Sequence, residues 1–122
     1  MSYTNIDDPS AYFQTATYSG SNSQQAITNN GNSDLKPDWL WIKQRSSTEN
    51  HMLVDSTRGV TKYLLSDSTT AEQTVTSRVE TLDTDGFTVN GSSNPVNALG
   101  GTYVAWQWKA NGGTTASNTD GS

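Results

Sequence analysis

The sequence contains no cysteine, and His51 is its single histidine. A disulfide scaffold and a thiolate metal site are therefore excluded. A zinc site would need three carboxylate or water ligands beside His51, and a histidine-based catalytic pair would need a partner in fixed geometry. Asp55 follows four residues later and does not complete either set. We interpret His51 as a structural residue, and the sequence predicts no metal and no cofactor.

Positive charge is scarce as well. The chain has 7 Lys and Arg residues against 12 Asp and Glu residues, which gives a net charge of -5 at pH 7. A protein that binds nucleic-acid phosphates or an anionic membrane surface needs the opposite sign. No apolar run approaches the roughly 20 residues of a membrane span, and residues 1–9 lack the basic and apolar regions of a signal peptide. The sequence therefore predicts neither a nucleic-acid partner nor a membrane partner.

Helix-forming surface residues are few, because charged residues make up only 16% of the chain. Long helical surfaces usually carry Glu, Lys and Arg, whereas the polar residues here are mostly Ser, Thr, Asn and Gln. Hydrophobic residues make up 31%, so the core must rely on 4 Trp, 5 Tyr and 2 Phe. Each buried aromatic removes about 150–250 Å² from water. A length of 122 residues fits one domain of β structure.

Two stretches with paired tryptophans are expected to form the centre of that domain. In an extended chain successive side chains point to opposite faces, so Trp106 and Trp108 share a face within residues 101–110. Trp39 and Trp41 have the same spacing within residues 37–43. Because large apolar residues are highly buried on average, we expect all four tryptophans to lie in the core. The alternative is that one tryptophan lies at an edge as a contact residue.

The rest of the chain reads as short strands separated by turns rich in Gly, Asn and Ser. Residues 83–86 are expected to form a hairpin turn in which Gly86 has positive φ. Residues 70–72 could carry one helical turn. The expected fold is a single jelly-roll-like β-sandwich over residues 1–110, followed by a flexible linker at 111–122. The remaining strands are expected at 11–18, 24–28, 51–55, 60–65, 74–82 and 87–89.

The carboxylates do not form a recognisable catalytic or metal-binding set. The run Asp83-Thr84-Asp85-Gly86 resembles the opening of a calcium loop, but Phe87 and Pro95 stand where such a loop needs oxygen ligands. A glycosidase needs two carboxylates about 5–10 Å apart, and nothing in the sequence pairs Asp55 or Glu80 with another acid. We therefore expect a non-enzymatic protein with no catalytic, cofactor-binding or metal-binding residues.

Several motifs occur in a distinctive order: YTNIDDP at 3–9, TYSG at 17–20, PDWLWIKQR at 37–45, VDSTRG at 54–59, DTDGFTV at 83–89 and TYVAWQWKA at 102–110. Together they resemble a small β domain of unassigned function. That domain occurs in virion structural proteins of tailed bacteriophages, marine and cyanobacterial ones especially. The resemblance covers nearly the whole chain.

The resemblance implies the N-terminal module of a tail fibre or capsid-attached fibre, located in the virion and acting by protein–protein docking. Its partners would be other virion proteins within a homo-oligomer, with a trimer as the expected state. The alternative is a carbohydrate-binding module that recognises a host surface glycan. Docking predicts that the four tryptophans are mostly buried. Glycan binding predicts at least two exposed, coplanar aromatic rings in a groove.

Overall fold

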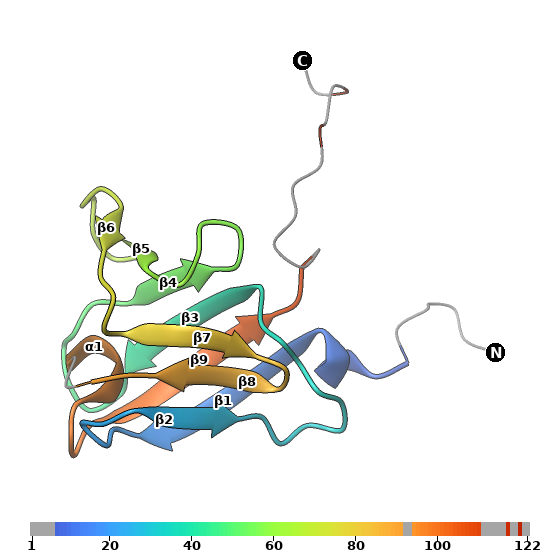
Figure 1. Cartoon of the computed structure of the whole chain (residues 1–122), viewed down its shortest axis with the longest axis horizontal. Coiled ribbons are helices and arrows are strands. Elements are labelled where there is room, and N and C mark those ends of the chain that lie inside the picture. Colours follow the sequence, from blue (N-terminus) through green and yellow to red (C-terminus); the bar gives the residue numbers. More distant parts are fainter. Residues whose placement is uncertain (1–6, 92–93, 111–116, 118–119, 121–122) are drawn as a thin grey trace.

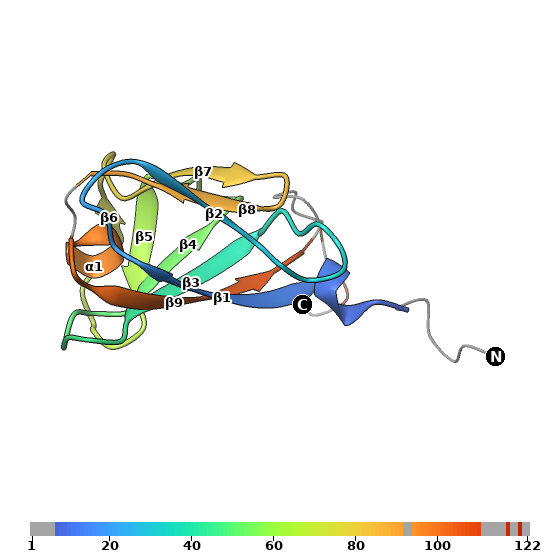
Figure 2. The ribbon, with the colours of Figure 1, turned by 90° about the horizontal axis from the view of Figure 1, so that it is seen from below.

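Two antiparallel sheets lie face to face and form a β-sandwich (Figures 1 and 2). The computed structural model describes residues 7–91, 94–110, 117 and 120. One sheet has six strands in the order β1-β9-β3-β4-β5-β6, and the other has three in the order β2-β8-β7. The predicted all-β sandwich of short antiparallel strands is confirmed. Most of the predicted linker at 111–122 lies outside the described residues.

The strands are short, as expected from the spacing of the turn residues. The larger sheet contains β1 (Phe13–Ser19), β3 (Trp39–Gln44), β4 (Met52–Asp55), β5 (Lys62–Leu65), β6 (Gln73–Thr74) and β9 (Thr102–Trp108). The smaller sheet contains β2 (Gln25–Thr28), β7 (Val79–Asp83) and β8 (Gly86–Val89). A 3-10 turn, η1 (Pro9–Ala11), precedes β1, and a one-turn helix, α1 (Asn94–Asn97), precedes β9.

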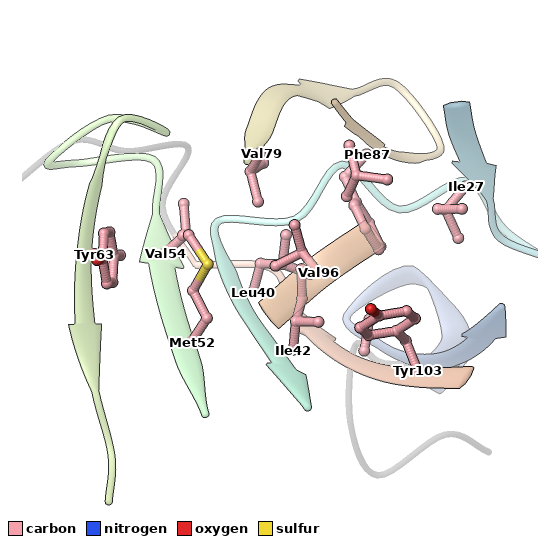
Figure 3. Packing of buried hydrophobic residues seen from close by; sticks show 12 residues of the cluster. Ile27, Leu40, Ile42, Met52, Val54, Tyr63, Val79, Phe87, Val96 and Tyr103 are labelled. Carbon is pink, nitrogen blue, oxygen red and sulfur yellow. The ribbon is translucent and has the colours of Figure 1, made fainter. Parts of the chain in front are cut away.

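The two tryptophan-bearing strands, β3 and β9, pair directly inside the larger sheet, as predicted. The side they present to the core is the opposite of the one expected. Leu40 and Ile42 of β3 are fully buried, as is Tyr103 of β9. Figure 3 shows these side chains meeting Val79 and Phe87 of the smaller sheet. The core therefore consists mainly of aliphatic residues with a few aromatic rings, and the tryptophans are not part of it.

The expectation that Trp39, Trp41, Trp106 and Trp108 fill the core is thus wrong. Each of these residues alternates with the buried residues of its strand, as the burial patterns of β3 and β9 show. Residues directly opposite each other in an antiparallel pair point to the same face, and Trp41 lies opposite Trp106. The two strands therefore orient together, and all four tryptophans lie on the outer face of the larger sheet.

A buried pair of amides explains how β9 can turn its apolar residues outward. Gln107 is fully buried, and its Nε2 donates to Asn29 Oδ1 over 2.7 Å. Asn29 Nδ2 donates in return to Gln107 Oε1 over 3.2 Å. A buried polar side chain is tolerated when it is hydrogen-bonded. The inward position of Gln107, which a sequence pattern assigns to solvent, is stabilised by a residue 78 positions away.

The predicted long strand at 74–82 is also wrong, because the chain leaves one sheet and enters the other there. β6 pairs with β5 in the larger sheet, whereas β7 pairs with β8 in the smaller one. The helical turn expected at 70–72 is absent, since those residues are irregular. The hairpin at 83–86 is confirmed: Gly86 has a φ of 128°, and a Cβ there would lie 1.9 Å from the carbonyl oxygen of Ile27.

Candidate functional site

The outer face of the larger sheet carries a row of aromatic side chains over three neighbouring strands. Phe13 of β1 lies opposite Trp108 of β9, and Trp108 lies opposite Trp39 of β3. Two residues away along the same two strands, Trp106 lies opposite Trp41. We call these five residues the aromatic face. Its strands β1, β9 and β3 lie side by side in Figures 1 and 2, which places the five rings together.

The rings pack on one another across the strands. The centroids of Phe13 and Trp108 are 5.1 Å apart, and those of Trp108 and Trp39 are 4.6 Å apart with an interplanar angle of 25°. Trp39 also stacks on Trp41 at 6.2 Å, and Trp41 meets Trp106 edge-on at 5.5 Å. Aromatic pairs in such geometries contribute about 0.5–1.5 kcal/mol each beyond their buried area. The array is therefore partly ordered before anything binds to it.

The aromatic face remains partly accessible to solvent. Phe13 is 40% exposed and Trp39 is 39% exposed. Trp41, Trp106 and Trp108 are half-buried, and they line a slot of about 250 Å³ whose wall is almost entirely apolar. Soluble monomers seldom expose large contiguous apolar surfaces, and those they do expose are often functional. This slot and its rim are the strongest candidate for a binding surface on the outer face.

Apolar residues extend the same face toward the next two strands. Trp41 lies opposite Leu53 of β4, and Leu53 lies opposite Leu64 of β5. Leu64 is 38% exposed. Beyond the row of Phe13, Trp108 and Trp39 lies Asp55, whose Oδ2 forms an ion pair with Arg58 Nε at 2.6 Å. The surface is thus a broad apolar strip with a charged border at one corner.

His51 holds one ring of the aromatic face in place. Its Nδ1 accepts a hydrogen bond from Trp41 Nε1 over 3.0 Å, and the two ring centroids lie 5.8 Å apart. The backbone amide of His51 donates to Asp67 Oδ1 over 3.1 Å. Burial tends to raise the pKa of Asp67, but the hydrogen bonds from His51 and Asn50 outweigh it and leave that pKa below its usual value. These contacts support the structural interpretation of His51.

Each candidate carboxylate is engaged in a hydrogen bond or ion pair of its own. Asp55 pairs with Arg58, and Asp83 accepts hydrogen bonds from Thr81 and Thr88 in the β7–β8 hairpin. Asp85 Oδ1 accepts from the backbone amide of Leu35. Glu80 accepts from the side chain of Gln24. Within the described ranges, no group of three or more His, Cys, Asp and Glu residues could hold a metal ion.

Comparison with known protein families decides where the chain belongs. A family model described as "Domain of unknown function (DUF7483)" matches residues 8–122. The chain is a member of this family. No curated protein and no solved structure matches it. The description of the DUF7483 family names no activity, so the function of this member has to be argued from its own surface.

The sequence did contain the signal for the aromatic face of this DUF7483 domain. The i, i+2 spacing of tryptophans in two strands predicts that each pair shares a face, and that is what the structure shows. Phe13 was missed, because only its register opposite Trp108 brings it into the array. Among the described residues no helix is long and apolar enough to cross a membrane.

Proposed function

We propose that the chain is a non-catalytic structural module of a virion appendage that docks onto a neighbouring protein through its aromatic face. The burial of the four tryptophans that docking was expected to require is not found, because they lie on the outer face of the larger sheet. The docking function is carried instead by the partly exposed array of Phe13 and four tryptophans around an apolar slot, which a partner can cover. Folding of the domain leaves this array outside the core. The resemblance of the sequence to appendage proteins of tailed bacteriophages supports the setting in a virion.

A protein partner fits this surface because the slot offers almost no polar atoms. Energetically important residues of protein interfaces are enriched in tryptophan, and they lie in apolar, well-packed central patches. The indole N–H of Trp41, one of the polar groups near the slot, already donates to His51. An apolar side chain of a partner would fill the slot without displacing this hydrogen bond. In an appendage this partner belongs to another virion subunit, within a homo-oligomer for which a trimer is the expected state.

The second candidate function is recognition of a host surface glycan. It is favoured by the exposure of Trp39 and by the slot between three other aromatic side chains. Two features disfavour it. Trp39 and Trp108 stack on each other at 4.6 Å, so these two rings do not lie side by side as one open platform. A sugar also needs hydrogen-bond partners, which the slot largely lacks.

The docking function can be tested on virus particles from the source of the chain. Antibody labelling and mass spectrometry of purified particles first establish whether the chain is present. Purified wild-type chain is then added to particles that lack it, beside a Trp39→Ala variant and a Leu99→Ala control. Leu99 is 76% exposed and lies in the loop before β9, so the control removes a more accessible apolar side chain outside the aromatic face.

We expect Trp39→Ala to lower the bound amount at least tenfold at limiting concentration, because a central tryptophan of an interface contributes about 2 kcal/mol or more. Leu99→Ala should bind like the wild type. The proposal would be contradicted if purified native particles did not contain the chain. It would also be contradicted if the Trp39→Ala and Leu99→Ala variants bound equally well to the particles that lack it. Loss of binding through competition by free monosaccharides or glycan fragments would favour the second candidate.

A further inference from the structure

We propose that a cavity at one end of the sandwich binds a small organic anion that carries hydroxyl groups, such as a carboxylated sugar. The cavity has a volume of about 570 Å³, within the range of about 300–1,000 Å³ usual for small-molecule sites. It lies where the loop before β3, the turn after β4, the end of β7 and the end of β9 meet, and Figure 1 shows all four at the same end of the molecule. It does not share residues with the slot of the aromatic face.

Two lysines give the cavity its positive charge. Lys36 from the loop before β3 and Lys109 directly after β9 both line it, and both residues are exposed. Arg58 forms ion pairs with Asp55 and Glu72, and neither lysine of the cavity takes part in these pairs. The carboxylate that lines the cavity beside the two lysines is that of Asp38. In a protein of net charge -5, a cavity lined by two lysines and one carboxylate favours an anionic ligand.

Two hydroxyl groups in the cavity wall are oriented as acceptors. Ser56 Oγ donates its proton to Asp38 Oδ1 over 2.8 Å, and Thr81 Oγ1 donates its proton to Asp83 Oδ1 over 2.6 Å. A hydroxyl oxygen also carries two lone pairs, which these bonds leave available. A ligand that matches the wall must therefore bring donors of its own. Hydroxyl groups on the ligand meet this requirement, whereas a simple aliphatic carboxylate does not.

Asp38 limits the charge that the cavity accepts. Its Oδ2 accepts from the backbone amide of Ala110 over 2.6 Å, and its backbone oxygen accepts from the amide of Ser56 over 2.8 Å. Asp38 is buried, so it is a fixed part of the wall. A fixed carboxylate repels a dianion such as phosphate more strongly than a singly charged carboxylate. One negative charge on the ligand, placed beside the lysines, is the better match.

Apolar residues complete the recognition surface. Val60 and Leu82 line the cavity and are half-buried. They offer a surface for the carbon–hydrogen groups of a ring while the polar groups contact its substituents. This combination of cations, acceptors and aliphatic wall corresponds to a ring bearing one carboxylate and several hydroxyls.

The ligand class can be tested by titrating the 122-residue chain with three probes and following backbone amide signals by NMR. Glucuronate carries a carboxylate and hydroxyls, glucose carries hydroxyls alone, and propionate carries a carboxylate alone. We expect saturable shifts at Lys36, Gly59 and Lys109 with glucuronate at the lowest concentration, and weaker responses to the other two probes. Added salt should weaken glucuronate binding, because the lysines are exposed and screened.

The variants Lys36→Gln and Lys109→Gln test the role of charge, with Lys62→Gln as the control. Lys62 lies on β5, and its Nζ donates to Thr74 outside the cavity. An exposed ion pair contributes about 0.2–1 kcal/mol, so each cavity variant should raise the dissociation constant by up to about fivefold, and the double variant by more than either. The control should bind like the wild type. Absence of saturable shifts with glucuronate, equal binding of glucose, or unchanged binding by the double variant would overturn the proposal.

Discussion

Replacing Asn97, the last residue of α1, by alanine should destabilise the fold far more than the exchange of an exposed loop asparagine. Asn97 is fully buried and uses all four of its hydrogen-bonding positions. Its Oδ1 accepts from Ser21 N at 3.0 Å and Gln25 Nε2 at 2.7 Å. Its Nδ2 donates to Ser23 O at 2.7 Å and Gly91 O at 2.9 Å. One side chain thereby ties the turn before β2 to the segment that leads from β8 to α1.

The expected loss follows from these four bonds. Each contributes about 0.5–1.5 kcal/mol net, which places the total at about 2–6 kcal/mol. The partner residues are only partly buried or exposed, so water can replace some of the bonds, and we expect about 2–4 kcal/mol. Alanine favours the helical conformation of α1, so the backbone itself adds no cost.

Urea unfolding followed by circular dichroism measures this difference. Asn32→Ala serves as the matched control, because Asn32 is an exposed residue in a loop. With a slope of about 1–3 kcal/mol per molar urea, Asn97→Ala should lower the midpoint by about 1 M or more. A midpoint equal to that of the Asn32→Ala variant would refute the reasoning that this amide joins the two segments.

Two further predictions concern the core. Leu40→Ala removes a fully buried side chain and should cost about 2–5 kcal/mol, whereas Trp39→Ala on the outer face should cost less, about 1–3 kcal/mol from its two ring pairs; a larger loss for Trp39→Ala in urea unfolding would mean that the indole lies inside. The pKa of Tyr18 is raised well above its usual value. Burial of the phenol is the larger cause, and the electrostatic effect of Tyr103 adds to it. The phenol of Tyr18 stays protonated in the folded state while the unfolded chain ionises above about pH 10, so stability is complete below that pH and is lost as the pH rises further. Unfolding monitored by tyrosinate absorbance checks this, and ionisation of Tyr18 near pH 10 in a chain that remains folded would contradict it.

Local features of the fold could be predicted from the sequence, and features that depend on distant partners could not. The β7–β8 hairpin follows from the short turn and from Gly86, which adopts positive φ. Both signals lie within a few consecutive residues of the sequence. The orientation of β3 is different, because both of its faces are apolar. Pairing with β9 decides it, and the inward face of β9 depends on the amide pair of Gln107 with Asn29. Composition alone gave the wrong side, since it favours burying Trp106 over Gln107.

The candidate sites divide in the same way. The i, i+2 spacing of each tryptophan pair predicts that its two side chains share a face. The exposure of that face depends on the smaller sheet, which covers the opposite face, including Leu40. The cavity at the end of the sandwich has no sequence signature. Lys36 and Lys109 are 73 positions apart (109 minus 36) and line one cavity because the loop before β3 and the end of β9 lie at the same end of the larger sheet.

The alternation along β3 and β9 has a consequence for how such a module can be altered. Even and odd positions of the same short segment serve separate purposes, one set holding the two layers together and the other facing outward. An outward indole can be exchanged for another large side chain without disturbing the layer beneath it. Under the docking function proposed above, redirecting the module to a different attachment point would require only a handful of substitutions, all confined to every second residue of three adjacent strands.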